Sequence, residues 1–347
     1  MKNYKKGIWN LDDLVKNPTR QTFDRKIKEI EKQSEKFAKN KSQLKANISS
    51  NKFLQLLHDI EDITEKSSKI GGYAGLKFSE DTQSEEATAL LTRISQFGSR
   101  IENKMLFFDL WWKKQVDDKN AKRLIRDAGD LSEYLRYKRL VAKYALTEPE
   151  EKIINTLDVT GISALVKIYD KITNAFTYTV NVNGKKKTMG REQLTTLVRN
   201  KNPKIREAAY KSLLTKYQDN KGVIGQIYQN IALNWKNEGI DMRGFRNPIS
   251  IQNISNDVDD KTIEVMLQVC KKNSPVFQKY FKQKAKRVGV KKLRRYDLYA
   301  PSKKSADEKN YTFDQGTKLV LDSLNKFSPK LQNTLHVYSM KIMLIIH

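Results

Sequence analysis

Apolar residues recur three or four positions apart through much of the first half of this chain, and this spacing restricts its fold more than any other feature. The runs cover residues 23–37, 53–63 and 85–112. Such spacing gives a helix one apolar and one polar face, so we expect three amphipathic α-helices there. The third run ends in the aromatic segment 107–112, which we expect to pack in the core because large rings gain most from burial.

The middle of the chain carries one clear helix start and one clear β signal. Thr147 is followed by Pro149 and Glu150, the pattern of a capping box that opens a helix. Apolar residues then alternate over 176–182, and Asn183-Gly184 favours a tight hairpin turn. We predict a mostly α fold with one small β-hairpin around 176–189, packed on neighbouring helices because a lone hairpin is marginal in water.

Four local patterns carry narrower predictions. The glycine cluster Gly71 to Gly75 lacks the strand and the Lys-Ser/Thr pair of a phosphate loop, and it predicts a turn or a close helix crossing. Two glycines and a proline in 238–248 predict the longest irregular stretch. Asp257 is expected to cap the next helix. Cys270, within that helix, is expected to be a small core residue.

Charge and cysteine usage exclude several classes of protein. The chain has 66 Lys and Arg against 40 Asp and Glu, a net charge of +26, which attracts polyanions. Basic residues are nevertheless spread along the chain, with only short clusters at 185–187, 284–287 and 291–295, so we interpret the charge as solvated surface and do not expect nucleic acid as a partner. One cysteine excludes an internal disulfide and a cysteine-rich metal site.

The ends of the chain carry no membrane signal. Asp12 and Asp13 interrupt any apolar stretch after the basic start, which argues against a secretory signal. No apolar run approaches the ~20 residues that a bilayer crossing needs. We therefore expect no membrane association and a cytoplasmic location.

Short motifs resemble those of one enzyme family in residue type, order and spacing. Besides the hairpin, they are Trp9–Leu14, Tyr73–Thr82, Leu146–Glu151, Thr160-Gly161, Arg206–Tyr210, Arg243–Phe245 and Tyr296–Pro301. In this order they resemble the oligoendopeptidase F branch of the thimet oligopeptidase-like zinc metallopeptidases, up to about Leu324. The resemblance implies an almost wholly helical fold of two lobes around a channel for short peptides, of which these residues would form one lobe and part of the next.

The same resemblance implies zinc, which the family holds with the two histidines of His-Glu-x-x-His and a downstream glutamate, the glutamate of the motif acting as general base. This sequence lacks that motif and has only three histidines. His58 fits the boundary of an amphipathic helix, and His336 and His347 lack the i, i+4 spacing that binds zinc. We therefore predict no catalytic, cofactor-binding or metal-ligating residue, and no zinc bound to this chain alone.

The resemblance also divides the chain. It predicts an N-terminal helical region (1–115), an oligopeptidase F N-terminal-type domain with the hairpin (116–200), the incomplete start of the peptidase catalytic domain (201–330) and an aberrant tail (331–347). The expected function is the N-terminal part of a zinc metalloendopeptidase for short oligopeptides, truncated before its zinc site and inactive alone. If the chain is truncated in this way, the helix near 311–324 should leave an apolar stripe partly exposed.

Two alternatives stay open. The first is a basic helical module that binds nucleic acid or another polyanion. The second is a remnant that docks on a complete paralogue or on a separately encoded catalytic half.

Overall fold

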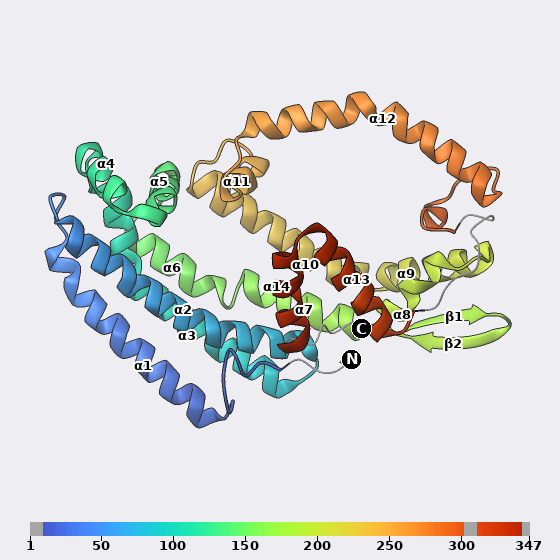
Figure 1. Cartoon of the computed structure of the whole chain (residues 1–347), viewed down its shortest axis with the longest axis horizontal. Helices are drawn as coiled ribbons and strands as arrows, with labels where there is room; N and C mark the ends of the chain where they lie inside the picture. The colour runs from blue at the N-terminus through green and yellow to red at the C-terminus, as the bar shows by residue number, and fades with distance from the viewer. Residues whose placement is uncertain (1–9, 302–310, 342–347) are drawn as a thin grey trace. The chain divides into compact units, whose positions relative to one another are not determined.

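Helices make up nearly all of the regular structure in the computed structural model, which describes residues 10–301 and 311–341, with side chains up to residue 335 (Figure 1). The α-helices in these ranges are α1 (Arg20–Ala38), α2 (Ser50–Glu80), α3 (Glu85–Lys114), α4 (Asp118–Asp127), α5 (Ser132–Leu140), α6 (Glu148–Asp158), α7 (Ile162–Asn174), α8 (Arg191–Thr196), α9 (Pro203–Asp219), α10 (Lys221–Asn234), α11 (Pro248–Ser255), α12 (Asp260–Val288), α13 (Phe313–Phe327) and α14 (Pro329–Lys341). A π-helical segment, Trp235–Met242, continues α10, and β1 (Tyr178–Val182) and β2 (Lys185–Met189) form a two-stranded sheet. The mostly α fold class is confirmed.

The chain folds as two compact units. The helical unit comprises residues 18–175 and 219–274, and the hairpin unit comprises 176–218 with the described parts of 1–17 and 275–347. The boundary at 274/275 falls inside α12, at its internal Pro275. Within the described ranges, no helix combines the length and the apolar composition that crossing a membrane would demand. The domain boundaries at 115, 200 and 330 stay predictions.

The core of the helical unit is built by aromatic residues of α1, α2 and α3. The ring of Phe53 lies 5.2 Å from that of Trp112 and 6.0 Å from that of Phe108, and Phe37 lies 5.8 Å from Phe108. Trp112 is fully buried, and its Nε1 donates to the carbonyl oxygen of Leu135 at 3.1 Å, which satisfies the polar edge of the indole. The prediction of core packing for the aromatic end of α3 is confirmed.

The hairpin forms where the sequence predicts it. Its strands pair antiparallel, and the chain turns at Asn183 and Gly184, whose φ angles are 53° and 80°. Positive φ at both central residues is what a two-residue hairpin turn requires. Tyr178 and Val180 bury one face of the hairpin against Leu194 of α8 and against α9, so the predicted packing on helices is also confirmed.

The prediction for the glycine cluster is wrong. Gly71 and Gly75 lie inside α2, a helix of 31 residues, and a Cβ at either position would meet no atom within 4 Å. The cluster is therefore neither a turn nor a close crossing. The buried neighbours Ile70, Tyr73 and Ala74 keep the helical spacing through the glycines, and this packing outweighs the low helix propensity of glycine.

The predictions for Cys270 and Asp257 are also wrong. Cys270 is exposed, because the adjoining apolar residues of α12, among them Val265 and Val269, lie on faces that are about half exposed. Asp257 has φ 53°, a left-handed conformation just past the end of α11. The carboxylate of Asp259 instead accepts the backbone N–H of Thr262 at 2.8 Å and so caps the start of α12.

The irregular stretch predicted for 238–248 is shorter than expected. Its first residues belong to the π-helical segment Trp235–Met242, and the amide nitrogen of Arg243 continues the pattern by donating to the carbonyl of Glu238 at 2.9 Å. Only Gly239 of the two glycines lies in this segment, where hydrogen bonds between residues five apart form a widened helical turn, and Gly244 follows it. Only 243–247 remain irregular before α11 begins.

Candidate functional site

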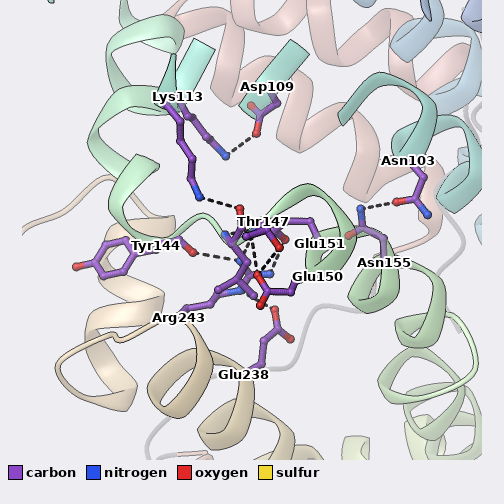
Figure 2. A network of polar contacts seen from close by, with 12 residues as sticks. Asn103, Asp109, Lys113, Tyr144, Thr147, Glu150, Glu151, Asn155, Glu238 and Arg243 are labelled. Carbon is purple, nitrogen blue, oxygen red and sulfur yellow. Dashed lines mark hydrogen bonds and ion pairs between the residues drawn. The ribbon is translucent and has the colours of Figure 1, made fainter. Parts of the chain in front are cut away.

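Arg243 lies at the centre of a polar network in the helical unit, with its side chain directed at the first turn of α6 (Figure 2). Its Nη1 and Nη2 donate to the two carboxylate oxygens of Glu151 at 2.8 and 2.9 Å. Its Nε donates to Oε1 of Glu238 at 2.9 Å, and Nη1 also donates to the carbonyl of Tyr144 at 3.2 Å. The guanidinium thus holds Glu151 in the bidentate geometry typical of strong arginine–carboxylate pairs.

The sequence before α6 explains why Glu151 points at Arg243. Thr147 and Glu150 form the predicted capping box, and the amide nitrogen of Thr147 donates to Oε2 of Glu150 at 2.8 Å. The amide nitrogen of Leu146 donates to Oε1 of Glu151 at 2.8 Å. The first turn therefore directs two carboxylates back toward the helix start, where unpaired N–H groups favour negative charge.

The network keeps its central charges ionised. Burial alone would raise the pKa of Glu151, but the hydrogen bonds from Arg243 and from the amide of Leu146 outweigh it and hold the pKa below its usual value. The hydrogen bond to Glu151 raises the pKa of Arg243, although burial opposes this shift. The pKa of nearby Asp158 moves the other way, because burial and then the charge of Glu238 disfavour its ionised form.

The residues after Arg243 complete the arrangement. Gly244 has φ 73°, a left-handed conformation that glycine adopts without strain. The ring of Phe245 then stacks on that of Tyr144, with ring centroids 3.7 Å apart and planes 6° from parallel. All three residues of the motif Arg243–Phe245 thus have a structural function in joining the segment before α6 to the segment before α11.

A second pair of motif residues forms a buried ion pair in the hairpin unit. Arg206 of α9 is 1% exposed and Asp297 is 2% exposed. Nη2 and Nε of Arg206 donate to Oδ1 of Asp297 at 2.5 and 3.2 Å, and Nη1 donates to the carbonyls of Asn200 and Lys201 at 2.8 and 3.1 Å. Oδ2 of Asp297 accepts the amide N–H of Arg294 at 3.1 Å. The charges are therefore compensated and almost fully hydrogen-bonded.

These two arrangements position chain segments. The arginines and carboxylates bond to one another and to nearby backbone carbonyl and amide groups, which is the geometry of structural ion pairs. Sequence reasoning used four of these residues (Glu151, Arg206, Arg243 and Asp297) as matching letters of separate motifs and missed that they form pairs. The opposite charges of the motif residues were the only signal that could have suggested it.

The histidines are placed as follows. Nδ1 of His58 lies 2.9 Å from Oε2 of Glu61 on an exposed part of α2, as the helix-boundary prediction requires. The His336 side chain and all of His347 lie outside the described residues. Among the described residues, no three His, Cys, Asp or Glu side chains are grouped so that they could hold a metal ion. The described side chains therefore do not fit a zinc site of the family type.

One part of the sequence matches a known protein family. Residues 196–325 match Peptidase family M3. The Oligoendopeptidase F homolog of Borreliella burgdorferi is 25% identical over 334 residues, covering 94% of this chain and 55% of the relative. The Group B oligopeptidase PepB of Streptococcus agalactiae is 20% identical over 302 residues, covering 83% of this chain and 48% of the relative.

The fold has a counterpart among crystal structures. The structure of oligoendopeptidase-F from Enterococcus faecium matches with a TM-score of 0.70 and 20% identity, over 88% of this chain and 62% of that one. The chain spans about half the length of the curated relatives it matches. Residues 196–325 therefore resemble Peptidase family M3 in sequence, and the chain as a whole resembles oligoendopeptidase F-like proteins in sequence and in fold.

Proposed function

We propose that this chain supplies the N-terminal and central portion of an oligoendopeptidase F-like zinc metalloendopeptidase, which hydrolyses internal bonds of short oligopeptides. We further propose that the zinc ligands and the general base are not among residues 1–347, so that these residues alone hydrolyse no peptide. The observation that carries it is the match of residues 196–325 to Peptidase family M3. The absence of His-Glu-x-x-His from the 347 residues supports the second part.

Exposed apolar surface on α13 also supports the proposal. Phe327 is 82% exposed and Leu319 is 55% exposed, while Leu321 is buried. The sequence prediction that this helix leaves an apolar stripe partly exposed is confirmed. Apolar surface of this kind is typical of a face that another protein segment covers, and we propose that further peptidase residues, on a longer chain or a separate one, cover it.

The decisive experiment measures metal and activity on the same sample. We expect purified residues 1–347 to contain less than stoichiometric zinc by mass spectrometry of the metal and to leave an internally quenched octapeptide uncut. The Enterococcus faecium oligoendopeptidase-F, assayed beside it, serves as the positive control for the peptide. Stoichiometric zinc together with cleavage by the 347 residues would overturn the inactivity part.

A partner would be recognised by what it restores. If a separate catalytic half exists, zinc should co-purify only when both parts are present, and binding of an apolar dye to α13 should fall on association. Dye binding that is already absent from the isolated chain would contradict the exposed surface.

As part of the same proposal we place the protein in the cytoplasm, because a chain with one cysteine has no need of an oxidising compartment.

A further inference from the structure

Most of the excess positive charge of the chain belongs to one of its two units. The residue ranges of the hairpin unit contain 30 Lys and Arg against 9 Asp and Glu, a net charge of +21. Those of the larger helical unit contain 36 against 31, a net charge of only +5. All three basic clusters seen in the sequence, at 185–187, 284–287 and 291–295, fall in the hairpin unit, so the fold concentrates a charge that the sequence distributes.

One segment of the hairpin unit, residues 279–295, contains nine Lys or Arg and no Asp or Glu. We call it the basic segment. Eight of the nine side chains are exposed, those of Lys279, Lys282, Lys286, Arg287, Lys291, Lys292, Arg294 and Arg295. None of the eight forms an ion pair with a carboxylate of the described ranges, whereas exposed cations elsewhere do, such as Lys69 with Glu65. Their charge is therefore available to an anionic partner.

The end of α12 brings the two clusters of the basic segment to one part of the surface (Figure 1). Gly289 has φ 77°, and the amide nitrogens of Gly289 and Val290 both donate to the carbonyl of Ala285, at 2.9 and 3.0 Å. This left-handed helix end turns the chain out of α12. Nζ of Lys284 then donates to the carbonyl of Leu298, which ties the chain after the turn back to the helix.

The segment that follows is held rigidly and presents an aromatic ring beside the cations. Asp297 is 2% exposed and bound to Arg206 of α9, so the carboxylate nearest to the second cluster is already occupied. Tyr299, two residues further, is 61% exposed, and the guanidinium carbon of Arg199 lies 5.7 Å from the centroid of its ring. Exposed rings beside cations are typical of surfaces that bind single-stranded nucleic acid, where bases stack on the rings and cations contact phosphates.

A membrane surface fits these residues less well. Binding to lipid by insertion requires exposed apolar side chains next to the cations. Beside the second cluster, Leu293 and Leu298 are only partly exposed and Ala300 is buried, which leaves the ring of Tyr299 with its polar hydroxyl. Three more exposed rings precede the cluster on α12, those of Phe277, Tyr280 and Phe281. They could contact bases or lipid, so they do not distinguish the two partners.

We propose that the basic segment, together with Arg199 and Tyr299, binds single-stranded nucleic acid. The cations contact the phosphates, and the ring of Tyr299 stacks on a base. DNA and RNA share this chemistry. The proposal goes beyond the proposed function and requires neither zinc nor hydrolysis, so either can fail without the other. It replaces our expectation from the sequence that the charge is only solvated surface.

The test measures the affinity of purified residues 1–347 for fluorescein-labelled oligo(dT) and oligo(U) of about 20 nucleotides, by fluorescence anisotropy over a series of salt concentrations. One variant removes four exposed cations of the second cluster, by Lys291→Gln, Lys292→Gln, Arg294→Gln and Arg295→Gln. Each phosphate contact contributes about −0.7 to the slope of log K against log salt, so we expect the slope to become shallower by about 3. At about 0.1 M salt the affinity should fall at least about tenfold.

A matched control removes the same number of exposed cations from α1 in the helical unit, by Arg25→Gln, Lys28→Gln, Lys32→Gln and Lys36→Gln. It lowers the net charge equally and should change the affinity less than about twofold. An equal loss in the two variants, or no loss in the variant of the second cluster, would refute the proposal.

The stacking part has its own variants. Tyr299→Ala should weaken binding about tenfold, the effect of one lost stack, and should leave the salt slope unchanged. Tyr299→Phe keeps the ring and should bind as the unchanged chain does. A duplex of the same length that binds more tightly than either single strand, together with unchanged affinity in Tyr299→Ala, would refute a single strand as the partner.

Vesicles that contain phosphatidylserine test the other class of partner. Binding to these vesicles that the variant of the second cluster abolishes, with no binding to either oligonucleotide, would assign the surface to a membrane and refute the proposal. Binding to the oligonucleotides supports it, and the tighter of the two shows whether the natural strand carries ribose or deoxyribose.

Discussion

Neutralising Asp297 should destabilise the hairpin unit more than any comparable change on its surface. Asp297→Asn keeps the shape of the side chain but leaves the guanidinium of Arg206, which is 1% exposed, without its counter-charge. Two hydrogen bonds join the pair, at 2.5 and 3.2 Å. Hydrogen bonds to charged groups contribute about 1.5–3 kcal/mol each, and breaking a buried ion pair costs about 3–5 kcal/mol. Both bonds end on Oδ1, so an Asn oxygen can still accept them as a neutral group, but the Asn NH2 then faces the amide N–H of Arg294 that Oδ2 accepts. We therefore expect a loss of about 3 kcal/mol.

Helix α9, which carries Arg206, also supplies the matched control. Glu207 pairs with Lys211 at 2.8 Å, but their side chains are 38% and 71% exposed. Glu207→Gln should therefore cost less than about 1 kcal/mol, as exposed ion pairs do. The double variant Arg206→Met, Asp297→Leu should cost clearly less than the two single changes added together, because no charge is left buried alone.

The assay is urea unfolding followed by circular dichroism, with hydrogen exchange to locate the effect. Peptides from 203–219 and 291–301 should lose protection in Asp297→Asn, while peptides from α1 to α3 should keep it. A loss for Asp297→Asn that does not exceed the loss for Glu207→Gln would refute the reasoning, since the pair would then behave as if it were exposed to water.

Three further predictions concern other parts of the fold. Gly184→Ala should lower the free energy of unfolding by about 1 kcal/mol, measured by thermal melting, because φ at this position is 80°; an unchanged melting temperature would contradict it. Glu151→Gln should cost about 2–3 kcal/mol at pH 7. The pKa of Glu151 is lowered on folding, so its contribution is present above the usual value of 4.5 and is lost as pH falls through the folded value; urea midpoints of the two proteins should therefore converge below that pH. Trp112→Phe should cost about 1–3 kcal/mol in urea unfolding, because it leaves the carbonyl of Leu135 without its indole donor in a buried place, and a cost within error of zero would argue against that hydrogen bond.

Local chemistry explains what could be predicted from sequence. Helical spacing of apolar residues gave the positions of α1 to α3, and the capping box at Thr147 gave the start of α6. Asn183-Gly184 gave the hairpin turn, because few other residue pairs adopt positive φ at both positions. The wrong predictions concern places where contacts between residues far apart in the sequence determine the structure. Neighbouring buried residues carry α2 through Gly71, and Cys270 is exposed because its apolar helix has no cover in the described part of the chain.

The residues of one chain determined by themselves that it is mostly helical, where its hairpin turns, and that no His-Glu-x-x-His occurs in it. These properties depend on neighbours within a few positions, which a sequence displays directly. Only the tertiary structure decided that Glu151 pairs with Arg243 and that Arg206 pairs with Asp297. The two partners of each pair lie about 90 residues apart in the sequence. The ionisation and the pairing of a charged side chain depend on the groups that folding brings within hydrogen-bond distance of it.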